Sequence, residues 1–94
     1  MIYQPEEWVL VKVSGKEPHY RVFGSWRGGY LDGDSWRLNS GVMSVVEEDN
    51  CYSFAGYSGS TYVCHKASYG IRSLHNTSTL NHYIENSRGL MELV

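Results

Sequence analysis

Short runs of alternating apolar and polar residues, separated by glycine-containing turns, follow one another from Trp8 to Lys66. In the first run Val9, Val11 and Val13 share one face, and the residues between them share the other. Alternation with a period of two is typical of β-strands. The pattern predicts strands at 8–13, 19–26, 35–39, 42–46, 51–55 and 61–66, with a further short strand at Tyr30–Leu31. We expect the first two strands to form an antiparallel hairpin, and the strand at 42–46 to continue the same sheet.

The pattern changes after the last of these strands. Three apolar residues recur at the spacing of one helical face, namely Leu80, Tyr83 and Ile84. The side-chain oxygens of Asn76-Thr77-Ser78 suit the start of a helix. We therefore predict a short helix at about residues 78–88, ended by Gly89. The apolar segment Leu90–Val94 either adds a last strand or joins a partner.

The predicted fold is one domain that spans residues 1–94 and is mainly β (α+β). Eight tyrosines and an aromatic share of 14% favour strands. Because strands follow strands with short turns, we expect a strongly curved antiparallel meander or a small barrel of five to six strands. One short C-terminal helix would cover a face or plug an end of it.

The register of the hairpin at 51–66 is left open by the sequence. If Tyr57-Ser58 forms the loop, Cys51 lies opposite Cys64. If Ser58-Gly59 forms it, Ser53 lies opposite Cys64 instead.

Charge and cysteine usage narrow the function classes. The net charge is −2 and basic residues form no stripe, which disfavours binding to a nucleic-acid duplex. The first residues lack the basic and apolar regions of a signal peptide, and no run has the length of a membrane span. We expect a cytoplasmic protein in which both cysteines are thiols.

The segment Phe23–Gly41 is the candidate site for a ligand or partner. It contains five of the ten glycines, and its Ser-Trp-Arg sequence occurs twice, ten residues apart. Arginine offers a fork of donors for phosphate or carboxylate, tryptophan a flat face, and glycine an accessible backbone. The candidate binding residues are Trp26, Arg27, Gly28, Gly29, Tyr30, Trp36 and Arg37.

Alternation along a strand sets a condition on this site. A tryptophan and the arginine after it point to opposite faces, so Trp36 and Arg37 line one pocket only if a bulge intervenes. In one interpretation both tryptophans belong to the core, and the arginines pair with Asp32, Asp34 or the acidic turn 47–49. In the others the segment is a protein-contact surface or a pocket for a nucleotide-like ligand.

Other chemistries have weaker signals. Cys51, Cys64, His65 and His75 lack the spacing of a zinc site, so we expect no metal and no cofactor. The residues best placed for acid–base catalysis are His19, Asp32 and Asp34, but no catalytic signature organises them. Stacking of single-stranded nucleic acid would use Tyr20, Trp26, Arg37, Tyr52 and Tyr62.

The runs His19–Tyr30 and Asp34–Gly41 resemble a family of short uncharacterised bacteriophage proteins, and Tyr62–Lys66 with Ser68-Tyr69-Gly70 fits the same pattern. The resemblance covers about residues 8–70 and brings no established activity and no functional residues with it. It implies a setting, the cytoplasm of a bacterial host. Small phage proteins of this kind often block a host protein or sequester a signal molecule of antiviral defence.

We therefore expect a non-enzymatic binding protein, a phage inhibitor of a host factor or of a defence system. It would act by protein contact or by sequestering a nucleotide-like signal. The alternatives are a small nucleic-acid-binding β-domain and a small nuclease or phosphodiesterase. Self-association into a homo-oligomer through residues 90–94 is a further alternative.

Overall fold

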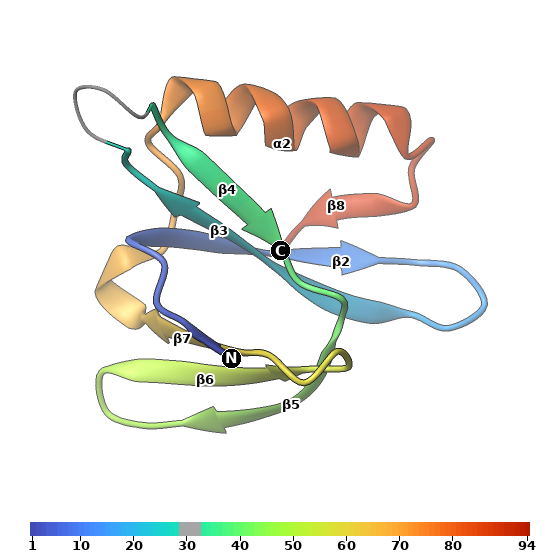
Figure 1. Ribbon diagram of the computed structural model, residues 1–94. Coiled ribbons are helices and arrows are strands. Elements are labelled where there is room, and N and C mark those ends of the chain that lie inside the picture. Colours follow the sequence, from blue (N-terminus) through green and yellow to red (C-terminus); the bar gives the residue numbers. More distant parts are fainter. Residues whose placement is uncertain (29–32) are drawn as a thin grey trace.

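The computed structural model describes residues 1–28 and 33–94 (Figure 1). The elements in chain order are β1 (Ile2–Tyr3), β2 (Glu7–Val13), β3 (His19–Trp26), β4 (Ser35–Leu38), β5 (Val42–Glu47), β6 (Cys51–Gly56), β7 (Thr61–His65), the 3-10 helix η1 (Lys66–Ser68), α2 (Leu74–Asn86) and β8 (Met91–Leu93). A mainly β fold with one α-helix near the C-terminus is confirmed. The strand expected at Tyr30–Leu31 lies outside the described residues.

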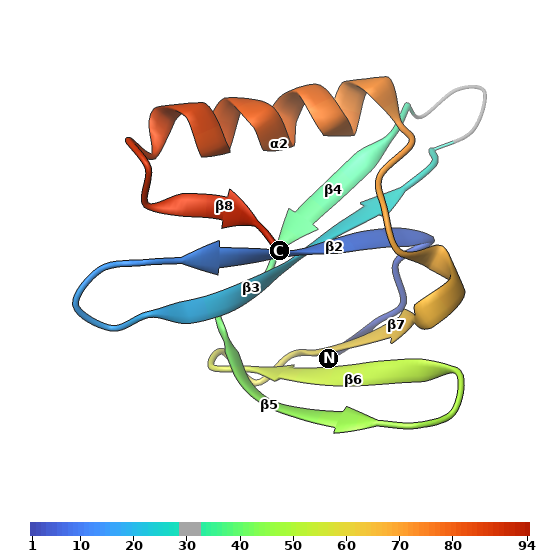
Figure 2. The ribbon, with the colours of Figure 1, turned by 180° about the vertical axis from the view of Figure 1, so that it is seen from behind.

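The strands form two four-stranded sheets. The first sheet has the order β4-β3-β2-β8, and the second has the order β1-β7-β6-β5. Figures 1 and 2 show three layers, with α2 above the first sheet and the second sheet below it. The described residues thus contain eight strands rather than five or six, and they form no closed barrel.

Each sheet is built on an antiparallel meander of three strands. In the first sheet β2 and β3 form the expected hairpin, from Glu7 opposite Ser25 to Val13 opposite His19. Near the C-terminus β8 pairs with β2, which confirms that the segment 90–94 docks as a last strand. In the second sheet β1 pairs with β7 in the parallel direction, so the sheet is not purely antiparallel.

The expectation that 42–46 continues the first sheet is wrong. After β4 the chain crosses to the second sheet at Gly41, whose φ is 129°. A Cβ at Gly41 would lie 3.0 Å from the Tyr57 ring, so the crossing is tightly packed. The physical reason for two sheets lies in β2, because Trp8 on one face and Val9 on the other are both buried. A single sheet with one helix leaves one of these faces in water.

Both registers considered for the β6–β7 hairpin are wrong, since Cys64 lies opposite Tyr52. The turn uses three residues rather than two, and Gly59 in it has a φ of 92°. The backbone N–H of Gly56 donates to the carbonyl of Ser60 at 2.8 Å and closes the loop. Three-residue hairpin loops of this type need one left-handed residue, which glycine supplies.

The helix begins four residues earlier than predicted. Ser73 is the N-cap, and its hydroxyl accepts a hydrogen bond from the backbone N–H of Asn76 at 3.1 Å. Asn76, which we expected at the start of the helix, lies within it and is fully buried. The helix ends at Asn86, and the chain turns away through Arg88 and Gly89, both at positive φ.

Two apolar clusters hold the layers together. The inter-sheet core consists of Trp8, Val22, Phe54, Tyr62 and Cys64. The helix–sheet core consists of Val9, Val11, Phe23 and Leu80. Among the described helices, none has both the length and the apolar character needed to cross a membrane.

Candidate functional site

The two tryptophans of the repeated Ser-Trp-Arg sequence lie on neighbouring strands of the first sheet and face opposite sides of it. Trp36 faces α2, where its ring stacks on Phe23 at 5.5 Å and meets the edge of Tyr83. Trp26 packs on the inter-sheet side beside Tyr3, and its indole N–H donates to the carbonyl of Gln4 at 3.1 Å. Both rings are partly buried and serve as packing residues.

The two arginines are also separated. Arg37 lies on the inter-sheet side, with its guanidinium 4.5 Å from the centre of the Tyr3 ring. Arg27 is exposed, and its backbone N–H donates to a Glu6 carboxylate oxygen. A Cβ at Gly28 would overlap the carbonyl oxygen of Gly33, so the chain itself fills the space that we expected a ligand to use. Gly29 and Tyr30 lie outside the described residues. Of the candidates that the structure describes, Trp26 and Arg37 both contact Tyr3 on the inter-sheet side. Trp36 faces α2 and Arg27 is exposed, so these four residues do not share one surface.

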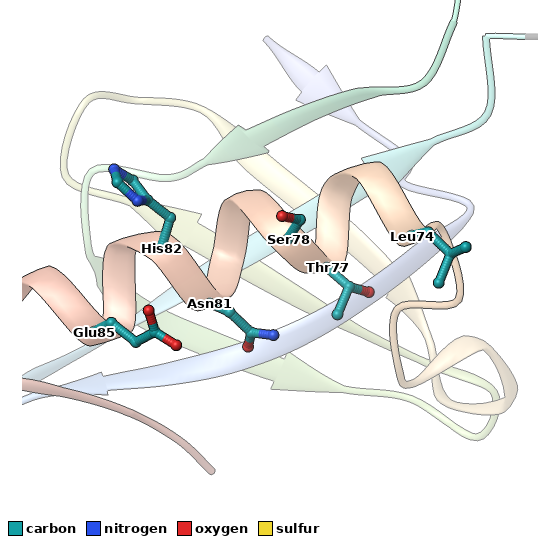
Figure 3. Close-up of a pocket in the computed structure, with 6 residues that line it drawn as sticks. All are labelled: Leu74, Thr77, Ser78, Asn81, His82 and Glu85. Atoms are coloured by element: carbon teal, nitrogen blue, oxygen red, sulfur yellow. The ribbon is translucent and has the colours of Figure 1, made fainter.

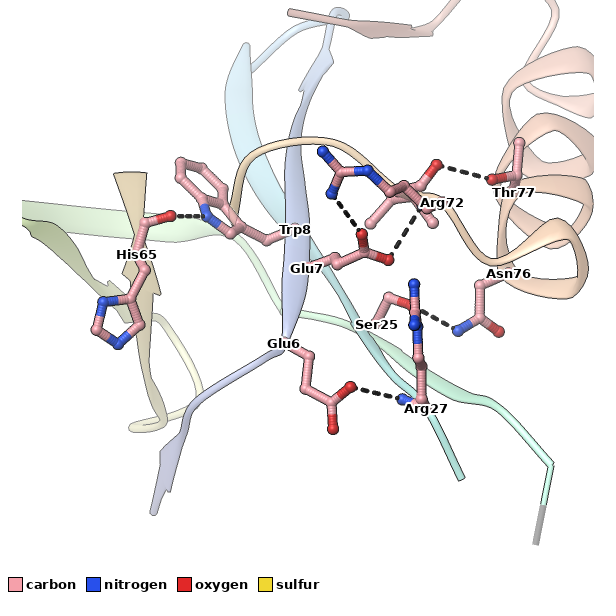
Figure 4. A network of polar contacts seen from close by, with 10 residues as sticks. Glu6, Glu7, Trp8, Ser25, Arg27, His65, Arg72, Asn76 and Thr77 are labelled. Carbon is pink, nitrogen blue, oxygen red and sulfur yellow. Dashed lines mark hydrogen bonds and ion pairs between the residues drawn. The ribbon is translucent and has the colours of Figure 1, made fainter. Parts of the chain in front are cut away.

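A polar network instead joins the start of α2 to the first sheet (Figure 4). Glu7 is 6% exposed and accepts two hydrogen bonds from Arg72, one from the guanidinium at 2.8 Å and one from the backbone N–H. Asn76 donates to the Ser25 hydroxyl and to the carbonyl of Ser35. Nearby, Asp34 accepts hydrogen bonds from the Ser73 hydroxyl and from the backbone N–H of Gly28. The sequence alone did not indicate this network.

The carboxylates of this network are held ionised. Burial raises the pKa of Glu7, but the hydrogen bonds and positive charge of Arg72 outweigh burial and lower the pKa below its usual value. The hydrogen bond from Ser73 lowers the pKa of Asp34, against a smaller effect of burial. Groups that stay ionised and paired at neutral pH are poor proton donors, so the network is suited to fixing the helix on the sheet.

Two of the three residues considered for acid–base catalysis, His19 and Asp34, lie far apart in the structure. His19 begins β3, whereas Asp34 precedes β4 beside the far end of β3. Seven residue steps of strand separate the two ends, which is about 23 Å. One ring nitrogen of His19 faces the carbonyl of Glu17, and the other accepts from Arg21. Residue Asp32 lies outside the described part of the chain.

The outer face of α2 carries a wide hollow of about 420 Å³ (Figure 3). All of its lining residues come from the helix itself, namely Leu74, Thr77, Ser78, Asn81, His82 and Glu85. With no second element as a wall, this surface cannot enclose a ligand.

An apolar pocket of about 420 Å³ opens between the two sheets, on the side where β5 and β8 form the sheet edges. It is lined by Trp8, Leu10, Val45, Tyr52, Phe54, Tyr69 and Val94. None of these side chains is charged. The pocket can therefore take an aliphatic or aromatic group and offers no counter-charge for a phosphate.

The floor of this pocket is a cluster of aromatic rings. The Trp8 ring lies 5.6 Å from that of Phe54 and 4.9 Å from that of Tyr69, the latter edge to face. The indole N–H of Trp8 donates to the carbonyl of His65 at 2.7 Å, which fixes the ring. The Tyr69 hydroxyl donates to the carbonyl of Val94 at 3.0 Å. Rigid aromatic walls of this kind lose little conformational entropy on binding.

Sequence reasoning named Tyr52 among residues for nucleic acid and did not single out the rest of the pocket. The lining residues are spread from residue 8 to residue 94, and each reads as an ordinary core position. The available signal was Val45-Val46, because two adjacent valines put an apolar side chain on each face of the 42–46 strand.

Comparison with protein-family models, with curated proteins and with solved structures gave no match to this chain.

Proposed function

We propose that this is a non-enzymatic binding protein that contacts another protein through the apolar pocket beside β5. The observation that carries the proposal is the uncharged aromatic pocket at an open edge of the two-sheet structure. The resemblance to phage proteins supplies the setting, in which the partner is a host factor or a component of a defence system in the bacterial cytoplasm. The protein would act as an inhibitor by occupying its partner's surface.

The edge strand suggests how the partner is held. Within the described residues β5 pairs with β6 and with no other strand, so one side of its backbone is free for hydrogen bonds. An extended segment of a partner can add to such an edge, with backbone hydrogen bonds for affinity and side-chain pockets for specificity. In that arrangement every second side chain of the segment faces the pocket side of the sheet.

A protein partner is favoured over a nucleotide by the charges around the pocket. Neither Arg27 nor Arg37 lines it, and the Arg37 guanidinium is already stacked on Tyr3. The phosphates of a nucleotide need a cation or several N–H donors. The pocket lining has no cationic side chain, and its indole N–H, that of Trp8, is already bonded to the carbonyl of His65.

The test uses a matched pair of residues on β5. Val45 lies opposite Phe54 and lines the pocket, whereas Val46 lies opposite Ser53 on the outer face of the sheet. The two side chains are 53% and 59% exposed, so aspartate at either position should cost a similar stability, about 1 kcal/mol, through its low strand propensity. Capture from a bacterial lysate with the wild type, Val45→Asp and Val46→Asp, followed by mass spectrometry, identifies proteins that depend on the pocket.

A partner captured by the wild type should keep its affinity for Val46→Asp and lose at least about tenfold for Val45→Asp, which corresponds to about 1.4 kcal/mol. Equal capture by both variants would contradict the proposal. Thermal melting with a panel of nucleotides tests the alternative, sequestration of a nucleotide-like signal. A ligand at 100 times its Kd stabilises the folded protein by about 2.7 kcal/mol. A nucleotide that gives such a shift would favour sequestration instead.

A further inference from the structure

The observed register of the β6–β7 hairpin places Cys51 directly opposite His65. Backbone hydrogen bonds join Lys66 to Asn50 at one end of the hairpin and Gly56 to Ser60 at the other. Because hydrogen-bonded and non-hydrogen-bonded pairs alternate along an antiparallel ladder, Cys51 and His65 form a non-hydrogen-bonded pair. Side chains approach most closely in such pairs, where the Cα atoms are about 4.5 Å apart.

Both side chains of this pair are accessible on the outer face of the second sheet. His65 is exposed and Cys51 is half-buried, and the two line one open hollow of about 610 Å³ with the acidic turn Glu48–Asn50. Figure 4 shows the imidazole of His65 turned away from the side on which its carbonyl meets Trp8. The imidazole is therefore free of the inter-sheet core.

We infer that Cys51 and His65 form half of a zinc site, which a second copy of this chain completes. Thiolate and imidazole are the ligands that zinc prefers, and structural zinc sites are closed by four ligands. No group of three or more candidate ligands lies together within residues 1–28 and 33–94, so one chain offers two donors here. Two copies related by a twofold axis present the same pair twice and give a set of two cysteines and two histidines.

Charge makes this association depend on the metal. Glu48 and Asp49 flank the pair, and a twofold axis through the site brings two such turns together. Like charges repel each other, so the acidic turns oppose association without metal, and the four metal–ligand bonds have to outweigh this repulsion. The third acidic residue beside the turn, Glu47, is already paired with Lys66 at 2.6 Å, so its charge is neutralised within one chain.

The experiment measures the mass of the full chain in solution with Zn²⁺ and then with a chelator. The expected result is a monomer without metal, a dimer with one zinc ion per two chains, and return to monomer with the chelator. Cobalt(II) as a substitute should show a thiolate charge-transfer absorption. Cys51→Ser and His65→Gln should each stay monomeric with zinc and lose most of the metal binding.

His82→Gln is the matched control, because His82 is an exposed histidine on α2 and should leave the zinc-dependent dimer unchanged. Three results would overturn the inference. They are a mass that zinc does not change, a dimer already present without metal, and a zinc-dependent dimer that persists in Cys51→Ser.

Discussion

Trp26 and Trp36 lie on opposite faces of the first sheet, although each is preceded by a serine and followed by an arginine. The register explains this arrangement, because Trp26 lies opposite Ser35 and Trp36 lies opposite Ser25. Residues directly opposite share a face, and neighbours along a strand do not. The repeated tripeptide thus supplies one aromatic ring to the inter-sheet core and one to the helix–sheet core.

The effects of substituting the two tryptophans on the free energy of unfolding should therefore be additive. Trp26→Ala and Trp36→Ala act on different cores, so their effects on the free energy of unfolding should sum to within about 0.5 kcal/mol. Trp36→Ala combined with Tyr83→Ala should instead show an interaction of about 0.5–1.5 kcal/mol, because those rings meet edge to face at 5.4 Å. Urea unfolding of the single and double variants measures both cycles. Strong coupling between the tryptophans would contradict their assignment to separate cores.

Strand positions could be predicted from the sequence, whereas their assignment to sheets could not. The strand at 19–26 was placed correctly because turn residues bound it on both sides. The crossing at Gly41 depends on tertiary packing, because the ring that lies against Gly41 belongs to Tyr57, a residue on a later hairpin. The apolar residues on both faces of β2 were the sign of a second layer, but period alone does not say what covers each face.

The start of α2 shows why the polar network escaped prediction. Ser73 and Asn76 both have side chains that cap helices, and the sequence offers no reason to prefer one. The choice is made by tertiary contacts, because Asn76 within the helix reaches Ser25 on β3. The proposed pocket also depends on tertiary contacts, because Trp8 and Val45 come together only when the two sheets are stacked.

Asn76→Ala should destabilise the protein by about 2 kcal/mol. The substitution leaves the buried Ser25 hydroxyl without its donor, at a cost of about 1–3 kcal/mol, and removes a donor from the partly buried Ser35 carbonyl. The higher helix propensity of alanine offsets part of this cost. The midpoint of thermal unfolding should fall by about 4–8 °C per kcal/mol. Asn81→Ala is the control, because Asn81 is exposed on the same helix and its replacement should be neutral or slightly stabilising. Equal effects of the two substitutions would argue against the network.

Stability should fall in acid through Glu7. Its pKa in the folded protein is below the ordinary value of 4.5, so its stabilising contribution is complete above that pH and is lost as the pH falls through the lowered pKa. The difference in the free energy of unfolding between the wild type and Glu7→Gln should therefore be largest at neutral pH and shrink below about pH 4.5. Urea unfolding over a pH series measures it. Glu85→Gln, on the exposed face of α2, is the control for the loss of a carboxylate outside the network.

The two cysteines should differ sharply in reactivity. Cys64 is 0% exposed, and burial, with a smaller effect from the neighbouring Cys51, raises the pKa of its thiol to about 12. The thiolate is the reactive form, so Cys64 should react with a thiol reagent at neutral pH only when the protein unfolds. Cys51 is partly exposed and should react in the native state. A native titration should therefore give one thiol per chain, denaturation should reveal the second, and Cys51→Ser should remove the native reaction. Two thiols that react at similar rates in the native protein would mean that the inter-sheet core around Cys64 is open to solvent.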